Sequence, residues 1–250
     1  MRKYGLIGYP LGHSFSKKYF EEKFARENIK GCAYENFQIK SITEFPVLLN
    51  KNPDLCGLNV TIPYKTEILK YVDFIDDDVE QIGAANVLKI RRESGKIHIS
   101  AYNSDVYGIR DSLVPCTRGK AHKVLILGSG GSSKAVAWTI RKMGCEAMMV
   151  SRTPRPGILS YNDLGPELLG TTQLIVNTTP LGMYPDVDSK PSIDYNLLTS
   201  RHILFDLVYN PEITTFLKMG KERGCKIITG MKMLRSQAER SWEIWNEDNP

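Results

Sequence analysis

The stretch from Leu125 to Ser133, L-I-L-G-S-G-G-S-S, restricts the fold of this chain more than any other. Its apolar residues, followed at once by closely spaced glycines, predict a buried strand that turns sharply into a helix. Such a turn leaves backbone N–H groups available at the helix N-terminus, where a diphosphate binds. Gly128 and Gly130 match the first two positions of G-x-G-x-x-G, and Ser133 occupies the third. On the glycines alone, a tight turn in another kind of α/β protein remains the alternative.

A second apolar run, about 20 residues further along, predicts which dinucleotide binds. This run, 147–150, ends in Ser151-Arg152-Thr153 rather than in Asp or Glu. A carboxylate there would accept from a ribose hydroxyl and repel a 2′-phosphate, whereas a hydroxyl and a guanidinium bind the phosphate. The sequence therefore predicts NADP rather than NAD as the cofactor.

The composition is that of a globular chain with a sizeable core. Of 250 residues, 42% are hydrophobic and 24% are charged, which suffices for one large or two modest domains. The net charge of +5 is dispersed among acidic residues, so it favours small anionic ligands and requires no nucleic acid. Five cysteines lie far apart without a C-x-x-C pair, and no apolar stretch approaches the roughly 20 residues of a membrane span. We expect a cytoplasmic protein with free thiols, no metal site and no membrane partner.

Alternating strand and helix signals predict mainly parallel α/β architecture. In the first part, strands are expected at 3–8, 33–38 and 57–63, helices near 17–28, 41–50, 64–71 and 76–82, and a hairpin at 87–91 and 96–100. A helix at 104–113 leads to a second part with strands at 124–127, 147–150, 174–177, 203–206 and 226–228. The last helix, 231–245, carries an apolar stripe beside which Gln237 needs a hydrogen-bond partner.

Polar side chains suited to binding or catalysis precede the glycine turn. Ser14 and Ser16 offer hydroxyl donors to a carboxylate, or else they cap the helix that follows. Asn59 and Thr61 share one face of a predicted strand. Lys65 lies at a helix start, an unfavourable place for a cation, so it is either solvated or functional.

Two further polar residues follow the same segment. Asn86 stands between small and apolar residues, which predicts partial burial. Asp105 either caps the helix that joins the two parts or offers its carboxylate to a ligand.

Nine motifs in order, from Gly8 to Gln237, resemble the shikimate dehydrogenase family and cover nearly the whole chain. They are G-Y-P-L-G-H-S-F-S, N-V-T-I-P-Y-K, G-A-A-N-V, N-S-D-V-Y-G, G-S-G-G-S-S, S-R-T, N-T-T-P-L-G-M, D-L-V-Y-N-P and G-M-K-M-L-R-S-Q-A. The resemblance implies NADPH-dependent reduction of 3-dehydroshikimate to shikimate, on the route to chorismate and aromatic amino acids. It also implies a substrate-binding α/β domain at 1–103, completed by a C-terminal helix at 231–250. A Rossmann-like NADP-binding domain is expected at 104–230, with a cleft between the two domains.

The resemblance also assigns roles to individual residues. The catalytic pair would be Lys65 and Asp105. The substrate-binding residues would be Ser14, Ser16, Asn59, Thr61, Asn86, Tyr209 and Gln237. The cofactor-binding residues would be Asp77, Gly128, Ser129, Gly130, Gly131, Ser132, Ser151, Arg152, Thr153, Arg155, Thr178, Leu207 and Gly230.

Elementary chemistry supports the assignment of the catalytic pair. Hydride transfer to a ketone places negative charge on the carbonyl oxygen, and a cation or acid close to that oxygen stabilises the transition state. Lys65 is the best candidate for this group, and the Asp105 carboxylate is suited to orient its ammonium and to accept from a substrate hydroxyl.

Other interpretations remain at this stage. A quinate/shikimate dehydrogenase that uses NAD or NADP is the nearest, and an inactive NADP-binding regulatory homologue is another. A purely structural role for all these polar residues requires nine coincidences in order. The expected partners are the small molecules shikimate and 3-dehydroshikimate, and the sequence leaves a monomer and a homodimer open.

Overall fold

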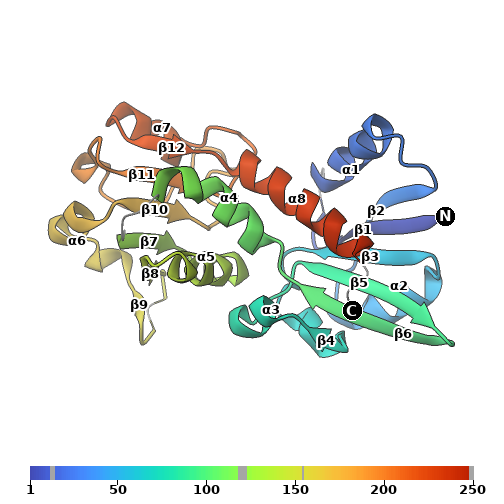
Figure 1. Ribbon diagram of the computed structural model, residues 1–250. Coiled ribbons are helices and arrows are strands. Elements are labelled where there is room, and N and C mark those ends of the chain that lie inside the picture. The colour runs from blue at the N-terminus through green and yellow to red at the C-terminus, as the bar shows by residue number, and fades with distance from the viewer. Residues whose placement is uncertain (12–14, 118–122, 154, 248–250) are drawn as a thin grey trace. The chain divides into compact units, whose positions relative to one another are not determined.

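The computed structural model describes residues 1–11, 15–117, 123–153 and 155–247, which form two compact units (Figure 1). The first unit holds Met1–Ser104 together with the chain from Ala238 onwards, and the second holds Asp105–Gln237. Each unit is built around one six-stranded sheet of the described chain. The C-terminal helix α8 (Gly230–Asn246, red in Figure 1) therefore contributes its first turns to the second unit and its last turns to the first.

The first unit is a mixed α/β unit. Its elements are β1 (Arg2–Gly8), α1 (Phe15–Arg26), β2 (Cys32–Gln38), the 3-10 helix η1 (Ile42–Glu44), α2 (Phe45–Lys51), β3 (Leu55–Val60), the 3-10 helix η2 (Glu67–Tyr71), β4 (Phe74–Ile75), α3 (Asp77–Ile82), β5 (Val87–Glu93) and β6 (Lys96–Tyr102). The strand order is β2-β1-β3-β5-β6-β4. The pairs β1–β2, β1–β3 and β4–β6 are parallel, whereas β3–β5 and β5–β6 are antiparallel. The predicted hairpin is β5–β6, and its turn residues Ser94 and Gly95 both have positive φ, as a tight hairpin requires.

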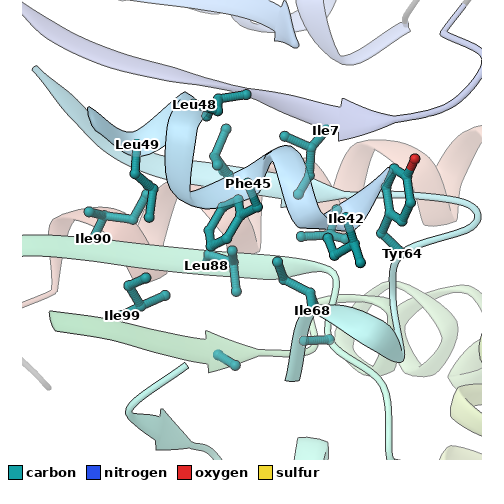
Figure 2. Packing of buried hydrophobic residues seen from close by; sticks show 14 of the residues in the cluster. Ile7, Ile42, Phe45, Leu48, Leu49, Tyr64, Ile68, Leu88, Ile90 and Ile99 are labelled. Carbon is teal, nitrogen blue, oxygen red and sulfur yellow. The ribbon is translucent and has the colours of Figure 1, made fainter. Parts of the chain in front are cut away.

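One face of this sheet packs against α2. Alternation along β1 sends Ile7 to this face, where it joins Phe45, Leu48 and Leu88 in a buried cluster. Figure 2 shows Phe45 of α2 pointing toward Leu88 of β5. Burial of these side chains ties the helix to the strands, since each contributes roughly 1.5–3 kcal/mol when fully removed from water.

The opposite face packs against α1 and the last turns of α8 in an aromatic cluster. Tyr4 of β1 stacks on Trp245 with ring centroids 4.8 Å apart, and the Trp245 indole N–H donates to the Leu88 carbonyl at 3.0 Å. Gly57 makes this contact possible, because a Cβ there would lie 2.4 Å from the indole nitrogen. The end of the chain is thus built into the core of the first unit.

The second unit is a doubly wound parallel fold. Its elements are α4 (Asp105–Thr117), β7 (Lys123–Leu127), α5 (Gly131–Lys142), β8 (Glu146–Val150), β9 (Ile158–Leu159), the 3-10 helix η3 (Tyr161–Asp163), α6 (Pro166–Thr171), β10 (Leu174–Asn177), the 3-10 helix η4 (Tyr195–Leu197), β11 (Ile203–Asp206), α7 (Thr215–Glu222), β12 (Lys226–Ile228) and the start of α8. The strand order is β12-β11-β10-β7-β8-β9, and the pairs along it are parallel. This is the Rossmann order, whose topological switch point lies between β7 and β10. The expected two-domain α/β class with a Rossmann-like half is confirmed.

The structure differs from the sequence-based expectations in a few elements. The helix expected at 64–71 is a turn followed by the 3-10 helix η2, because the Lys65 carbonyl accepts from the Ala85 N–H instead of continuing a helix. The strands β4 and β9 were not expected, since two residues carry no readable period. In the part of the chain that the structure describes, no helix combines the length and the apolar character needed to cross a membrane.

Candidate active site

The switch point of the second unit is held by a set of hydroxyl groups. Gly128, directly after β7, has φ of 124°, and a Cβ there would lie 2.5 Å from the Thr178 Oγ1. The Thr178 hydroxyl donates to the Leu127 carbonyl at 2.7 Å, so it accepts from the Ser133 hydroxyl, also at 2.7 Å. Ser133 therefore does more than replace the third glycine of the motif, because its hydroxyl ties α5 to the end of β10.

The N-terminus of α5 opens onto accessible space. Gly130 is the N-cap residue in extended conformation, and a Cβ built there meets no atom within 4 Å. Gly131 and Ser132 start the helix, so their N–H groups belong to the unpaired donors of its first turn. Ser129 and Gly130 are exposed. A diphosphate fits this arrangement, since the donors and the helix dipole both favour an anion.

The segment after β8 lies beside the glycine turn. The Ser129 hydroxyl donates to the Ser151 Oγ at 3.2 Å, and the Thr153 N–H donates to the same oxygen at 3.2 Å. Arg152 is exposed, and its charge lowers the pKa of the nearby Tyr161, which burial raises by a larger amount. The structure thus brings together the residues predicted for the diphosphate and for the 2′-phosphate. Arg155, also exposed, forms a β-bridge with Ile158.

A buried carboxylate that the sequence interpretation missed organises the ends of β10 and β11. Asp206 Oδ1 accepts from the Val208 N–H and from Asn177 Nδ2, both at 3.0 Å, and Oδ2 accepts from the Thr214 hydroxyl at 2.6 Å. Asn177 Oδ1 in turn accepts from the N–H and hydroxyl of Thr179. Burial raises the pKa of Asp206 to about 6, although these three hydrogen bonds oppose the shift. The network fixes the loops that follow both strands.

Leu207 and Gly230 meet directly after β11. A Cβ on Gly230 would lie 2.6 Å from the Leu207 carbonyl oxygen, so only glycine permits this approach. The Leu207 N–H donates to the Asn177 carbonyl at 3.0 Å and extends the sheet by one residue. Tyr209 follows, and burial raises the pKa of its phenol. Two predicted cofactor residues and one predicted substrate residue therefore share this part of the second unit.

In the first unit, one edge of the sheet gathers the predicted substrate residues. β1 and β3 end at this edge, β5 starts there, and β6 returns to it. The Thr61 N–H donates to the Ile7 carbonyl at 2.9 Å, and the Val60 N–H donates to the Asn86 carbonyl at 2.9 Å. The Lys65 carbonyl accepts from the Ala85 N–H at 2.8 Å, which ties the backbone of the half-buried lysine to the residue before Asn86.

The remaining predicted residues have distinct surroundings. Ser14 lies outside the described residues. Asp77 is exposed at the first position of α3, whose N-cap is Asp76. Asp105 is buried at the first position of α4. Gln237, on α8, is 8% exposed and its Nε2 donates to the Leu234 carbonyl at 3.1 Å. This carbonyl is the hydrogen-bond partner expected for the amide of Gln237.

Asn59 and Ser16 are held by internal hydrogen bonds. Asn59 Oδ1 accepts from the Tyr34 hydroxyl at 2.8 Å, and its Nδ2 donates to the Ser241 Oγ at 3.0 Å. Ser16, which lies in the first turn of α1 rather than at its N-cap, hydrogen-bonds the Tyr34 phenol. Sequence patterns gave no sign of Tyr34 or Ser241, because each is an ordinary residue on a strand or a helix face.

Comparison with known proteins shows similarity along the whole chain. Residues 6–88 match the family model described as the shikimate dehydrogenase substrate binding domain. The curated shikimate dehydrogenase (NADP(+)) of Methanococcus aeolicus is 36% identical over 262 residues, which span 98% of this chain and 92% of the relative.

Solved structures show the same relationship. A crystal structure of a shikimate dehydrogenase in complex with NADP⁺ is 31% identical and superposes with a TM-score of 0.85, covering 98% of this chain and 90% of that one. The shikimate 5-dehydrogenase of Thermus thermophilus, in complex with NADP(H) and shikimate, is 26% identical with a TM-score of 0.85 and covers 98% and 94%.

Proposed function

Because the chain belongs to the shikimate dehydrogenase family, we propose that it catalyses the reversible NADPH-dependent reduction of 3-dehydroshikimate to shikimate. The observation that carries the proposal is the glycine turn of a Rossmann sheet, hydrogen-bonded through Ser129 to the Ser151-Arg152-Thr153 segment. This arrangement offers an anion site for a diphosphate and an exposed guanidinium for a 2′-phosphate. The product would feed chorismate and aromatic amino-acid biosynthesis. The five free cysteines of the chain suit a reducing compartment such as the cytoplasm.

We assign most of the NADP-binding residues to the second unit and most of the substrate-binding residues to the first unit. When bound, NADPH would supply the hydride for the reduction, and NADP⁺ would accept it in the reverse direction. The open N-terminus of α5 fits its diphosphate, and the residues after β8 fit its 2′-phosphate. The full cofactor set comprises Asp77, Gly128, Ser129, Gly130, Gly131, Ser132, Ser151, Arg152, Thr153, Arg155, Thr178, Leu207 and Gly230. Asp206 supports this set, because its hydrogen bonds hold the loops that carry Thr178 and Leu207.

The substrate is a carboxylate with several ring hydroxyls, so its site needs donors for the acid and mixed partners for the hydroxyls. Ser14, through its hydroxyl, and Ser16, in the first turn of α1, would anchor the carboxylate with hydrogen bonds of a class typically worth about 1.5–3 kcal/mol. Asn86 and Thr61 stand at the sheet edge where such a ring would find both donors and acceptors. Asn59, Tyr209 and Gln237 complete the proposed set.

Lys65 and Asp105 would carry the proton chemistry. As the hydride reaches the carbonyl carbon, negative charge grows on the oxygen, and the Lys65 ammonium would donate a proton to it. In the oxidative direction the amine takes that proton back. The Asp105 carboxylate would accept from a substrate hydroxyl and orient the ammonium. Its burial strengthens both interactions, since they act in a medium of low dielectric constant.

The assay is NADPH formation from shikimate and NADP at alkaline pH, followed by absorbance. We expect Lys65→Ala to lower kcat by about 10²–10⁴ while the KM for shikimate changes little, because acid–base assistance acts on the transition state. Lys70→Ala is the matched control, since Lys70 is an exposed lysine five positions further on. A variant at position 65 with normal kcat and a raised KM would demote the lysine to a binding residue.

The same assay separates the proposed function from its alternatives. A kcat/KM that favours NADP and shikimate over NAD and quinate supports it. Equal use of quinate and NAD would indicate a quinate/shikimate dehydrogenase instead. NADP binding without any shikimate oxidation would identify an inactive homologue.

A further inference from the structure

A continuous line of buried hydrogen bonds crosses the first unit beneath the edge that carries the proposed substrate residues. It runs through side chains from five separate parts of the chain. Their exposed fractions are 3% for Tyr34, 6% for Asn59, 0% for Ser241, 1% for Ser104 and 3% for Asn86. Polar groups this deeply buried are costly unless each is bonded, so the line demands a precise arrangement of its members.

The first half of the line joins β2, β3 and α8. The Tyr34 hydroxyl donates to Asn59 Oδ1 at 2.8 Å, and Asn59 Nδ2 donates to the Ser241 Oγ at 3.0 Å. Asn59 Nδ2 also lies 3.4 Å from the Asn86 carbonyl oxygen. The amide of Asn59 is therefore engaged on both its oxygen and its nitrogen by neighbours within the fold.

The second half reaches the residue proposed to bind the substrate ring. The Ser241 and Ser104 hydroxyl oxygens lie 3.1 Å apart, and Asn86 Nδ2 donates to the Ser104 Oγ at 3.1 Å. The Ser104 N–H donates to Asn86 Oδ1 at 2.7 Å. Ser104 thus bonds both the nitrogen and the oxygen of the Asn86 amide and fixes the orientation of that side chain.

At its other end the line holds the proposed carboxylate anchor. Burial raises the pKa of Tyr34 and the hydrogen bond from Ser16 lowers it: because the Tyr34 proton goes to Asn59, the Tyr34 oxygen accepts from the Ser16 hydroxyl. This bond uses the hydroxyl proton of Ser16 and holds the first turn of α1, whose Ser16 N–H is then the donor that remains for a carboxylate. Ser16 sits at the start of α1, on an element that shares no sheet bond with Asn86. The hydrogen-bonded line is what relates the orientations of these two side chains.

We propose that Tyr34 and Ser241 are positioning residues for the substrate, acting through Ser16 at one end and through Ser104 and Asn86 at the other. Asn59 links the two halves of the line, since its amide bonds Tyr34 through its oxygen and Ser241 through its nitrogen. The inference rests on the proposed function. A site binds a polyhydroxylated ring acid less tightly when the protein's donors and acceptors must be ordered on binding. Side chains that are already ordered in the free protein lower this entropic cost of binding.

The test compares Tyr34→Phe and Ser241→Ala with the wild-type enzyme in steady-state oxidation of shikimate by NADP. We expect each variant to raise the KM for shikimate about five- to tenfold, the range typical of one lost buried hydrogen bond. The KM for NADP should stay at the wild-type value, and kcat should stay within about twofold, because the line touches neither the cofactor nor the reacting atoms.

Two control variants remove similar hydroxyl groups elsewhere. Tyr195→Phe deletes a buried phenol that donates to the Pro191 carbonyl, and Ser112→Ala deletes a buried hydroxyl that donates to the Gly108 carbonyl. Both belong to the second unit and lie outside the proposed machinery. They report the effect of losing a buried hydroxyl on stability alone, and neither should change the KM for shikimate.

A double-mutant cycle distinguishes positioning from general loosening. If Tyr34 acts through Ser16, the effect of Tyr34→Phe on the KM for shikimate disappears in a Ser16→Ala background. The inference is overturned if the two effects add, if both KM values rise together, or if the variants behave like their controls. A wild-type enzyme that fails to oxidise shikimate would instead overturn the proposed function, and this inference with it.

Discussion

Asp206 should make the stability of this protein depend on pH in a direction unusual for a carboxylate. It is fully buried and accepts hydrogen bonds from Val208, Asn177 and Thr214, yet burial dominates and raises its pKa from 3.8 to about 6. The native chain therefore binds this proton more tightly than the unfolded chain. The free energy of unfolding should fall as the pH rises through the window from about 4 to 6.

The magnitude follows from the size of the shift. A difference of about 2 pKa units, at roughly 1.4 kcal/mol per unit, corresponds to on the order of 3 kcal/mol. Asp206→Asn removes the titration and keeps the shape of the side chain. The amide oxygen of the new side chain remains a hydrogen-bond acceptor, and its nitrogen is able to donate to the Thr214 hydroxyl. The stability of the variant relative to wild type should thus increase by up to about 3 kcal/mol between pH 4 and pH 7.

Urea unfolding at several pH values, followed by circular dichroism, measures this difference. Asp163→Asn is an informative control, because hydrogen bonds from Ser160 lower the pKa of that exposed carboxyl. Its stability contribution is present above the unfolded pKa of 3.8 and is lost as the pH falls below that value, so this control responds only below about pH 4. The relative stability of this control should therefore change with pH in the opposite direction. A stability difference between Asp206→Asn and wild type that stays constant from pH 4 to pH 7 would refute the reasoning.

Two other substitutions test the cofactor site and the core. Arg152→Ala should raise the KM for NADP by about ten- to a hundredfold and leave the KM for NAD nearly unchanged, since a charged hydrogen bond to phosphate contributes about 1.5–3 kcal/mol. Steady-state kinetics with both cofactors measure the two KM values. An equal rise in both would show that the arginine does not recognise the phosphate. Gly57→Ala should lower the free energy of unfolding by about 1–3 kcal/mol, because its Cβ would meet the Trp245 ring; denaturant unfolding measures the loss, and an unchanged midpoint would contradict the packing.

Local patterns predicted the elements whose signals are local. The apolar runs of β7, β8, β10 and β11 stand at the predicted positions, and the turn with positive φ at Ser94 and Gly95 closes the predicted hairpin. The segment 64–71 was predicted less well. The helix expected there is wrong over 64–66, and only Glu67–Tyr71 forms a 3-10 helix. The Lys65 carbonyl accepts from the N–H of Ala85, a residue that lies outside any short sequence window around Lys65.

The candidate site divides in the same way. The glycine turn and Arg152 were predicted from the sequence, because residue type and spacing indicate their chemistry. Asp206 was missed as a site residue, since an acidic residue at a strand end is unremarkable until its partners are known. Asn177 lies 29 positions away in the chain and becomes its neighbour only because β10 pairs with β11.

The amino-acid sequence by itself determined the α/β class, the dinucleotide turn, the preference for a 2′-phosphate and the order of the family's motifs, because periodicity and residue chemistry are properties of short segments. Tertiary structure alone decided that Tyr34, Asn59 and Ser241 form one buried line, and that the Asp206 carboxylate is buried among three donors. Hydrogen bonding and desolvation depend on which distant segments the fold brings within about 3 Å of each other, and no local pattern records that.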